Sequence, residues 1–119
     1  SPTIVFGADG APVAVVGSAG GSRIIGHVAQ TLVAMLDWGL DPQEAVALPR
    51  VGGRDGAVEV EAGTPAAALA DGLRERGAPV EVRPNVSGLH AIRIGRGPDG
   101  GRRLIGGADP RREGVAVGD

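Results

Sequence analysis

The sequence predicts an α+β domain in which mostly antiparallel strands pack against helices. Two observations point to this class: two β-hairpin signals accompany two further strand-like runs, and three other segments have helical features. A hairpin comes first, instead of the repeated strand and crossover helix of a parallel sheet. The length of 119 residues fits one domain over residues 1–119.

The first hairpin is predicted from two β-rich runs, residues 3–6 and 12–17, on either side of an Asp9–Gly10 turn signal. The second run contains four consecutive apolar residues, 13–16. Such runs are typical of strands covered on both faces. We therefore expect this strand to lie inside the sheet.

A largely buried helix is expected over about residues 23–38, because Ile25, Val28, Leu32 and Met35 recur at helical spacing. Ser22 is a candidate N-cap for this helix. Gly39 is expected to end it, because glycine is common just past the C-terminal end of helices.

Two shorter helices follow. Asp41 and Glu44, three residues apart around Pro42, form a capping-box pattern at the start of one, which Pro49 should end. The other starts at Thr64–Pro65 and closes at Gly77, with leucines on one face.

The remaining strands are predicted from alternation and turn chemistry. Residues 50–56 are too glycine-rich to assign, whereas residues 57–63 and 79–83 alternate as half-exposed strands. Residues 90–95 and 102–107 flank a Gly-Pro-Asp-Gly turn and predict a second hairpin. The last residues, 108–119, read as a loop-like tail.

Composition and charge exclude several functional classes. The chain is 42% hydrophobic and 22% charged, as in ordinary globular proteins, and its net charge of −2 argues against nucleic acid or an anionic membrane surface as partner. It has no cysteine and no apolar run of the ~20 residues that span a bilayer. Phe6 and Trp38 are its only aromatic residues. The core must therefore pack many small residues well or be completed by another chain.

The segment most suggestive of chemistry is the glycine-rich stretch from Gly17 to Arg23, between an apolar strand and the first helix. Glycine backbones there leave N–H groups uncovered beside the positive end of the helix dipole, which suits an anion or an oxyanion. The spacing matches neither GxGxxG nor the phosphate-loop pattern, which disfavours a nucleotide. A tight turn that lets helix and sheet approach closely explains the same glycines equally well.

Other polar residues have plainer explanations. His27 reads as a packing residue of the buried helix, and His90 starts a strand with no partner at metal-ligand spacing, so no metal is implied. Charged side chains of two strands read as solvated faces: Glu59, Glu61, Arg102 and Arg103.

Four blocks of this sequence, in the same order, resemble the γ-glutamyltranspeptidase family: SPTIV, GSAGGSRI, QEAVALPR and GGADPRREGVAVG. The resemblance covers nearly the whole chain. It implies that the chain corresponds to the C-terminal part of that family's small catalytic subunit. Its members are N-terminal-nucleophile hydrolases with an αββα sandwich. They mature by self-cleavage, and the exposed N-terminal threonine attacks γ-glutamyl amides such as glutathione, with an α-amino group as base. No cofactor is implied.

The resemblance assigns roles to particular residues. Gly20 and Gly21 match the glycine pair whose amides stabilise the tetrahedral oxyanion, and Ser18 beside them is the further candidate for substrate binding. Asp109-Pro110-Arg111 matches the family's closing motif, where we expect a structural turn that fixes the last strand.

Other parts of the family's site lie outside this chain. The nucleophilic threonine and two substrate-binding serines lie upstream of Ser1, and the carboxylate-binding arginine belongs to the large subunit. The isolated chain is therefore expected to lack turnover. Its partners would be the upstream remainder of the precursor and a γ-glutamyl small molecule. A second copy of the fragment could also cover its core. The family is often exported to the periplasm or cell surface.

Alternatives remain open. Ser1 resembles an N-terminal nucleophile, but the SPTIV match puts it inside the catalytic subunit, and Pro2 restricts its amine. A non-catalytic interaction scaffold that kept the fold but lost the nucleophile is a second candidate. The family pattern is lost after Arg50 and at Asp119, and a sister acylase of the same fold, such as a cephalosporin acylase, is a third.

Overall fold

The computed structural model describes residues 2–118. The chain divides into two compact units, one formed by Ser1–Ala47 with Ser87–Asp119 and the other by Leu48–Val86. The single domain expected over residues 1–119 stays a prediction. Within that range the structure distinguishes these two units.

The first unit contains a four-stranded antiparallel sheet of two hairpins. Its order is β1 (Thr3–Phe6), β2 (Pro12–Gly17), β6 (His90–Arg96) and β7 (Arg102–Ala108). Both predicted hairpins are confirmed, and β2 lies inside the sheet as expected. The mixture of helices with mostly antiparallel strands confirms the predicted α+β class.

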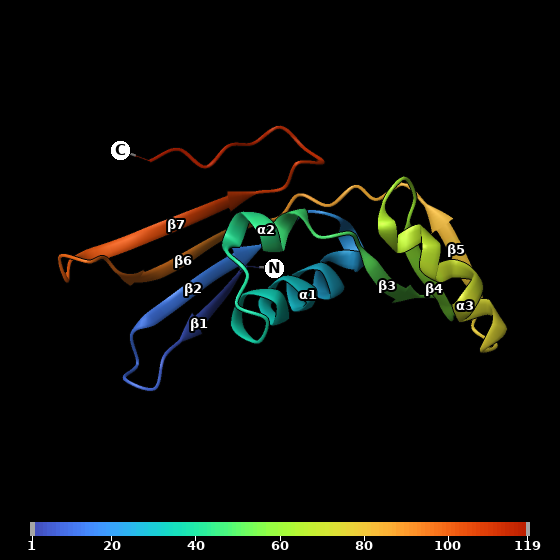
Figure 1. The fold of residues 1–119 in the computed structure, drawn as a ribbon, viewed down its shortest axis with the longest axis horizontal. Coiled ribbons are helices and arrows are strands. Elements are labelled where there is room, and N and C mark those ends of the chain that lie inside the picture. Colours follow the sequence, from blue (N-terminus) through green and yellow to red (C-terminus); the bar gives the residue numbers. More distant parts are fainter. Residues whose placement is uncertain (1, 119) are drawn as a thin grey trace. The chain divides into compact units, whose positions relative to one another are not determined.

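Helices cover one face of this sheet (Figure 1). They are α1 (Ile24–Leu36), which follows the 3₁₀ turn η1 (Gly21–Arg23), and α2 (Pro42–Ala47). Small side chains of the covered face, Ala14, Val16 and Ala91, are at most 1% exposed. At Gly107 a Cβ atom would lie 2.5 Å from the backbone carbonyl of Pro42. The backbones of α2 and β7 are therefore in direct contact.

The opposite face of the same sheet is apolar and open. Strand alternation and the pairing register place Ile4, Ile92 and Leu104 on this face, where they are 41–57% exposed. The face is also covered in part where the C-terminal segment turns back along β7 (Figure 1), with Ala116 over Gly106. The prediction that β2 is covered on both faces was wrong, because Val13 and Val15 are only half-buried.

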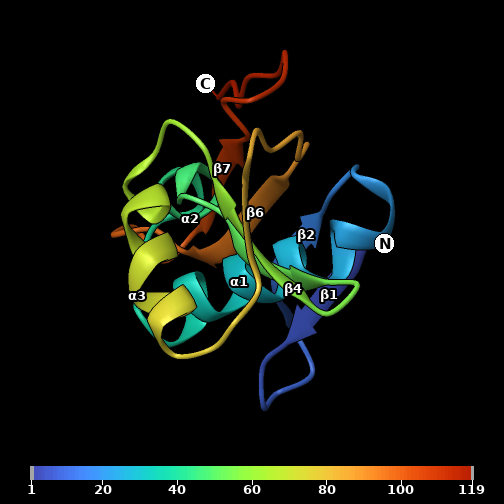
Figure 2. The same cartoon turned by 90° about the vertical axis from the view of Figure 1, so that its right-hand side faces the viewer.

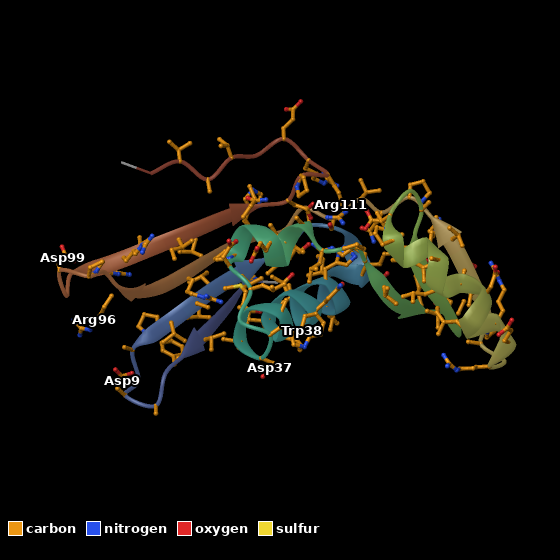
Figure 3. All side chains as sticks on the ribbon, in the orientation of Figure 1. Asp9, Asp37, Trp38, Arg96, Asp99 and Arg111 are labelled. Carbon is orange, nitrogen blue, oxygen red and sulfur yellow. The ribbon has the colours of Figure 1, made fainter. Side chains whose placement is uncertain are left out.

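The ends of α1 differ from the prediction at one point. Ser22 is not an N-cap, because the helix is entered through the 3₁₀ turn and no side chain caps it. At the other end Asp37 is the C-cap, Trp38 is exposed (Figure 3), and Gly39 has the expected positive φ of 73°. The guanidinium of Arg93 donates to two carbonyls there, those of Met35 (2.7 Å) and Leu40 (2.6 Å).

The predicted capping box of α2 is confirmed. The Glu44 N–H donates to the Asp41 carboxylate at 2.9 Å, and the Asp41 N–H donates to Glu44 at 3.1 Å. The amide of Gln43 then pairs with both the N–H and the carbonyl of Ala108 at 3.0 Å. These bonds tie α2 to the end of β7.

The second unit is a three-stranded sheet with one helical segment (Figures 1 and 2). A buried cluster of Val60, Ala66 and Ala70 joins sheet and helix. The elements in chain order are β3 (Val51–Arg54), β4 (Ala57–Glu61), η2 (Pro65–Ala68), α3 (Leu69–Glu75) and β5 (Val80–Arg83). Strand β5 runs parallel to β4, the one parallel pairing among the described residues.

This unit contains a strand in a segment that the sequence did not assign, and it corrects one interpretation. The glycine-rich residues 50–56 contain strand β3, which turns into β4 at Asp55 and Gly56, both with positive φ (51° and 84°). Glu59 and Glu61 are not solvated. The Glu61 carboxylate is buried and accepts the Arg50 N–H at 2.8 Å, and Glu59 pairs with Arg83 at 3.2 Å. Alternation alone did not reveal these partners.

None of the described helices has the length and apolar character needed to cross a membrane.

Candidate functional site

The glycine loop, residues 17–23, connects the end of β2 to α1. Gly20 has φ 134° and Gly21 has φ 61°, both in the region that side chains disfavour. Arg23 then donates its N–H to the Gly20 carbonyl at 3.4 Å, which closes the 3₁₀ turn ahead of the helix. The loop is thus a tight turn that requires glycine, which was one of the two explanations that the sequence allowed. The other was a pocket for an anion or oxyanion.

The same turn leaves backbone donors unused. The N–H groups of Gly20, Gly21 and Ser22 form no hydrogen bond with any residue that the structure describes. Gly21 is exposed, and a Cβ atom built on it would meet nothing within 4 Å. Adjacent unpaired amides before a helix can donate to one oxygen that carries negative charge. A tight turn and a site for an oxyanion are therefore compatible explanations of these glycines.

Ser18 lies beside these donors, but its hydroxyl is turned toward the loop itself. Its Oγ donates to the Ala19 carbonyl at 2.7 Å, and the residue is half-buried. The hydroxyl oxygen can still accept a hydrogen bond. Its predicted role in substrate binding stays a prediction.

The glycine loop is attached to the segment that enters β6. The Ala19 N–H donates to the Gly88 carbonyl at 3.3 Å. Gly88 and its neighbours Ser87 and Leu89 are buried. Sequence reasoning missed Ser87, because a single serine among loop residues carries no motif.

Asp109, just after β7, is the buried acid of this region and is 1% exposed. Its carboxylate accepts hydrogen bonds from the Ser87 hydroxyl, the Leu89 N–H (3.2 Å), the Arg111 N–H (3.0 Å) and the Arg111 guanidinium (3.0 Å). Burial raises the pKa of Asp109, but the hydrogen bonds from Ser87, Arg111 and Leu89 lower it more, so the pKa lies below its ordinary value.

Arg111, labelled in Figure 3, extends this network to α2. Its guanidinium also donates to the Val46 carbonyl at 3.3 Å. The Arg112 N–H donates to the Asp109 carbonyl at 3.2 Å, which closes a turn. These bonds agree with the structural turn expected at Asp109-Pro110-Arg111, and the side chains of its ion pair are 12% and 0% exposed.

Comparison with known proteins identifies the family. The family model described as gamma-glutamyltranspeptidase matches residues 1–119. A glutathione hydrolase proenzyme of Escherichia coli is 38% identical over 113 residues, which cover 93% of this chain and 18% of that protein. The chain belongs to the gamma-glutamyltranspeptidase family.

Solved structures of other proteins share the fold. A T380A mutant of Helicobacter pylori gamma-glutamyltranspeptidase superposes with a TM-score of 0.82 at 33% identity, over 94% of this chain and 60% of that one. A cephalosporin acylase of Bacillus halodurans gives a TM-score of 0.72 at 29% identity, over 87% of this chain and 19% of that one. The fold is thus confirmed as part of an N-terminal-nucleophile hydrolase sandwich.

As a family member, the chain spans less than a fifth of the length of the E. coli relative. The curated relatives are proenzymes, which agrees with a longer precursor. Ser1 and Asp119, which entered the sequence interpretation, lie outside the described residues.

The histidines lie where the sequence placed them. His27 is buried on α1, and His90 begins β6. Within residues 2–118, no group of three or more His, Cys, Asp or Glu side chains is placed to hold a metal ion.

Proposed function

We propose that this gamma-glutamyltranspeptidase chain is the C-terminal portion of an enzyme that transfers or hydrolyses the γ-glutamyl group of glutathione and related amides. In this proposal an upstream N-terminal threonine is the nucleophile, and this chain supplies the oxyanion hole. The observation that carries it is the set of unpaired amides at Gly20 and Gly21, in a chain of this family.

The proposed chemistry uses these amides twice. When the threonine oxygen bonds to the γ-carbonyl carbon, its proton passes to the α-amino group that serves as base. The carbonyl π electrons move to oxygen, and the Gly20 and Gly21 N–H groups donate to that oxyanion. Collapse breaks the C–N bond, the amine leaves with the proton from the α-amino group, and the acyl-enzyme remains. Attack by water or an acceptor amine, which gives its proton to the same base, forms a second oxyanion in the same place. Its collapse breaks the ester bond and returns the proton to the threonine oxygen. Donors fixed before the reaction stabilise both intermediates without reorganising.

The proposal needs the upstream remainder of the precursor as a partner. The open sheet face with Ile4, Ile92 and Leu104 supports this, because contiguous exposed apolar area marks a surface that another element covers. A second copy of this chain is the other possible cover. In either case we expect the isolated chain to lack turnover, since the nucleophile lies upstream.

A sister acylase is the alternative candidate function. The structural similarity to a cephalosporin acylase favours it, because the same oxyanion loop would serve any amide acyl group. The two candidate functions differ in substrate. The test therefore compares the steady-state rates of the complete protein with a γ-glutamyl anilide and with a β-lactam side-chain amide.

The oxyanion role is tested by Gly21→Val in the complete, mature enzyme. We expect kcat to fall by about 10² to 10³, the scale for loss of one oxyanion donor, because a branched side chain displaces or covers the amides. The measurement is the steady-state rate with the γ-glutamyl anilide.

Gly100→Val is the matched control. Gly100 also has positive φ (78°, against 61° at Gly21) and also has nothing within 4 Å of a built Cβ, but it lies in the β6–β7 hairpin. The control bears the same backbone strain and should keep kcat within about twofold. Equal rates in the two variants would refute the oxyanion assignment. A preference of the parent enzyme for the β-lactam side-chain amide would favour the acylase.

A further inference from the structure

A chain of hydrogen bonds, buried at its Asp109 end, connects the end of the last strand to the glycine loop. Asp109 accepts from the Ser87 hydroxyl and from the Leu89 N–H (3.2 Å). Between these two donors, the Gly88 carbonyl accepts the N–H of Ala19 at 3.3 Å. Ala19 immediately precedes Gly20. The Asp109 carboxylate is therefore two hydrogen bonds away from the proposed oxyanion donors.

This connection is buried and closely packed at its Asp109 end, whereas Ala19 at its other end is exposed. Ser87 and Leu89 are fully buried, and Asp109 is 1% exposed. A Cβ atom at Gly88 would lie 2.9 Å from the Arg112 side chain and 3.4 Å from the Ala19 Cβ. Hydrogen bonds in such a site are stronger than in water and fix the groups they join.

The Ser87 hydroxyl is not needed to satisfy the carboxylate. Without it, Asp109 would still accept three N–H bonds from Leu89 and Arg111. What the hydroxyl adds is a second attachment for the segment that carries the Gly88 carbonyl, on the side away from Leu89. Removal of the hydroxyl should therefore loosen Gly88 more than Asp109.

We propose that Ser87 is a positioning residue, which with Asp109 holds the Gly88 carbonyl and through it orients the Gly20 and Gly21 amides. Ser87 itself touches no reacting group. This inference rests on the proposed oxyanion role of the glycine pair. Its consequence is that the rate depends on a hydroxyl that acts through the backbone of the glycine loop.

The kinetic test is Ser87→Ala in the complete, mature enzyme. We expect kcat to fall about tenfold while KM stays within about twofold, because displaced oxyanion donors weaken an interaction made mainly in the transition state. Ser87→Thr keeps the hydroxyl and should restore most of kcat. If the alanine variant yields no mature enzyme, Ser87→Cys, of similar size but a weaker donor, carries the same test.

Thr31→Val is the matched control. Thr31 is another fully buried hydroxyl, and it donates to the His27 carbonyl at 2.9 Å within α1. Loss of that bond removes comparable hydrogen bonding without touching the glycine loop. The control should keep the parental kcat. An equal fall of kcat in the control and in Ser87→Ala would overturn the inference.

Hydrogen exchange separates the inference from the proposed function. In Ser87→Ala, we expect a peptide over residues 17–23 to exchange faster, because the Ala19 amide loses its fixed acceptor. Unchanged exchange there would overturn the inference whatever the rate. Faster exchange with an unchanged kcat would leave the structural link standing and would instead refute the oxyanion role of Gly20 and Gly21.

Discussion

The two faces of the four-stranded sheet show how one set of strands meets two environments. On the covered face, Ala14 and Ala91 are small and at most 1% exposed, and helices of the same chain pack on them. On the open face, Ile92 and Leu104 are large, apolar and 41% and 57% exposed. The chain thus covers one face of the sheet with its own helices and leaves large apolar side chains exposed on the other.

The largest expected effect comes from a charge on the open face. If the upstream remainder of the precursor covers this face, Leu104→Arg in the complete protein buries an unpaired charge, and we expect a loss of about 3–5 kcal/mol in the free energy of unfolding. Denaturant unfolding of the complete protein measures it. Leu69→Arg, at an apolar residue of α3 that is 53% exposed and lies outside this sheet, is the control and should change stability by under ~1 kcal/mol. An equally small effect of Leu104→Arg would show the face to be open in the complete protein.

The covered face and the open face were only partly predictable from sequence. Both hairpins, the position of β2 and the capping box at Asp41 followed from local chemistry, because turns and caps are set by neighbouring residues. The exposure of Val13 and Val15 did not follow, since a run of valines looks the same whether its second cover belongs to this chain or to another.

The residues of the candidate site likewise include some that local sequence predicts and some that only the fold brings together. Consecutive glycines before a helix are a local signal that singles out the segment from Gly17 to Arg23, and the family resemblance then assigns the oxyanion role to Gly20 and Gly21. Ser87 and Asp109 are 22 residues apart, and only the fold brings them together. Strand β3 was not predictable for a different reason: its two glycines give no side-chain alternation, and its pairing with β4 defines it as a strand.

A second, smaller effect contrasts two adjacent glycines of β7 that point to opposite faces. A Cβ at Gly107 would lie 2.5 Å from backbone atoms of Pro42, whereas one at Gly106 would lie 2.9 Å from the Ala116 side chain. Helix α2 is held by its own hydrogen bonds to Ala108 and has no room to move. We expect Gly107→Ala to cost about 1–3 kcal/mol.

Gly106→Ala is the control for that substitution, because the C-terminal segment can shift away from the added methyl group. Its cost should be under ~1 kcal/mol. Melting temperatures of the two variants of the complete protein provide the measurement. A larger loss in Gly106→Ala than in Gly107→Ala would mean that the C-terminal segment, and not α2, is the more rigid neighbour of β7.

The smallest expected effect is the pH dependence contributed by Asp109, just after β7. Its pKa in the folded protein lies below the ordinary value of 3.8, so the unfolded chain takes up a proton first as the pH falls. The stabilisation from the ionised carboxylate is therefore fully present above pH ~4 and is lost as the pH drops below that value toward the lowered pKa.

Asp109→Asn removes this titration. The melting-temperature difference between parent and variant should be constant from pH 7 to pH 5 and should shrink below pH 4. A difference that grows on acidification would mean that the folded protein favours the protonated acid, contrary to the four hydrogen bonds that the carboxylate accepts.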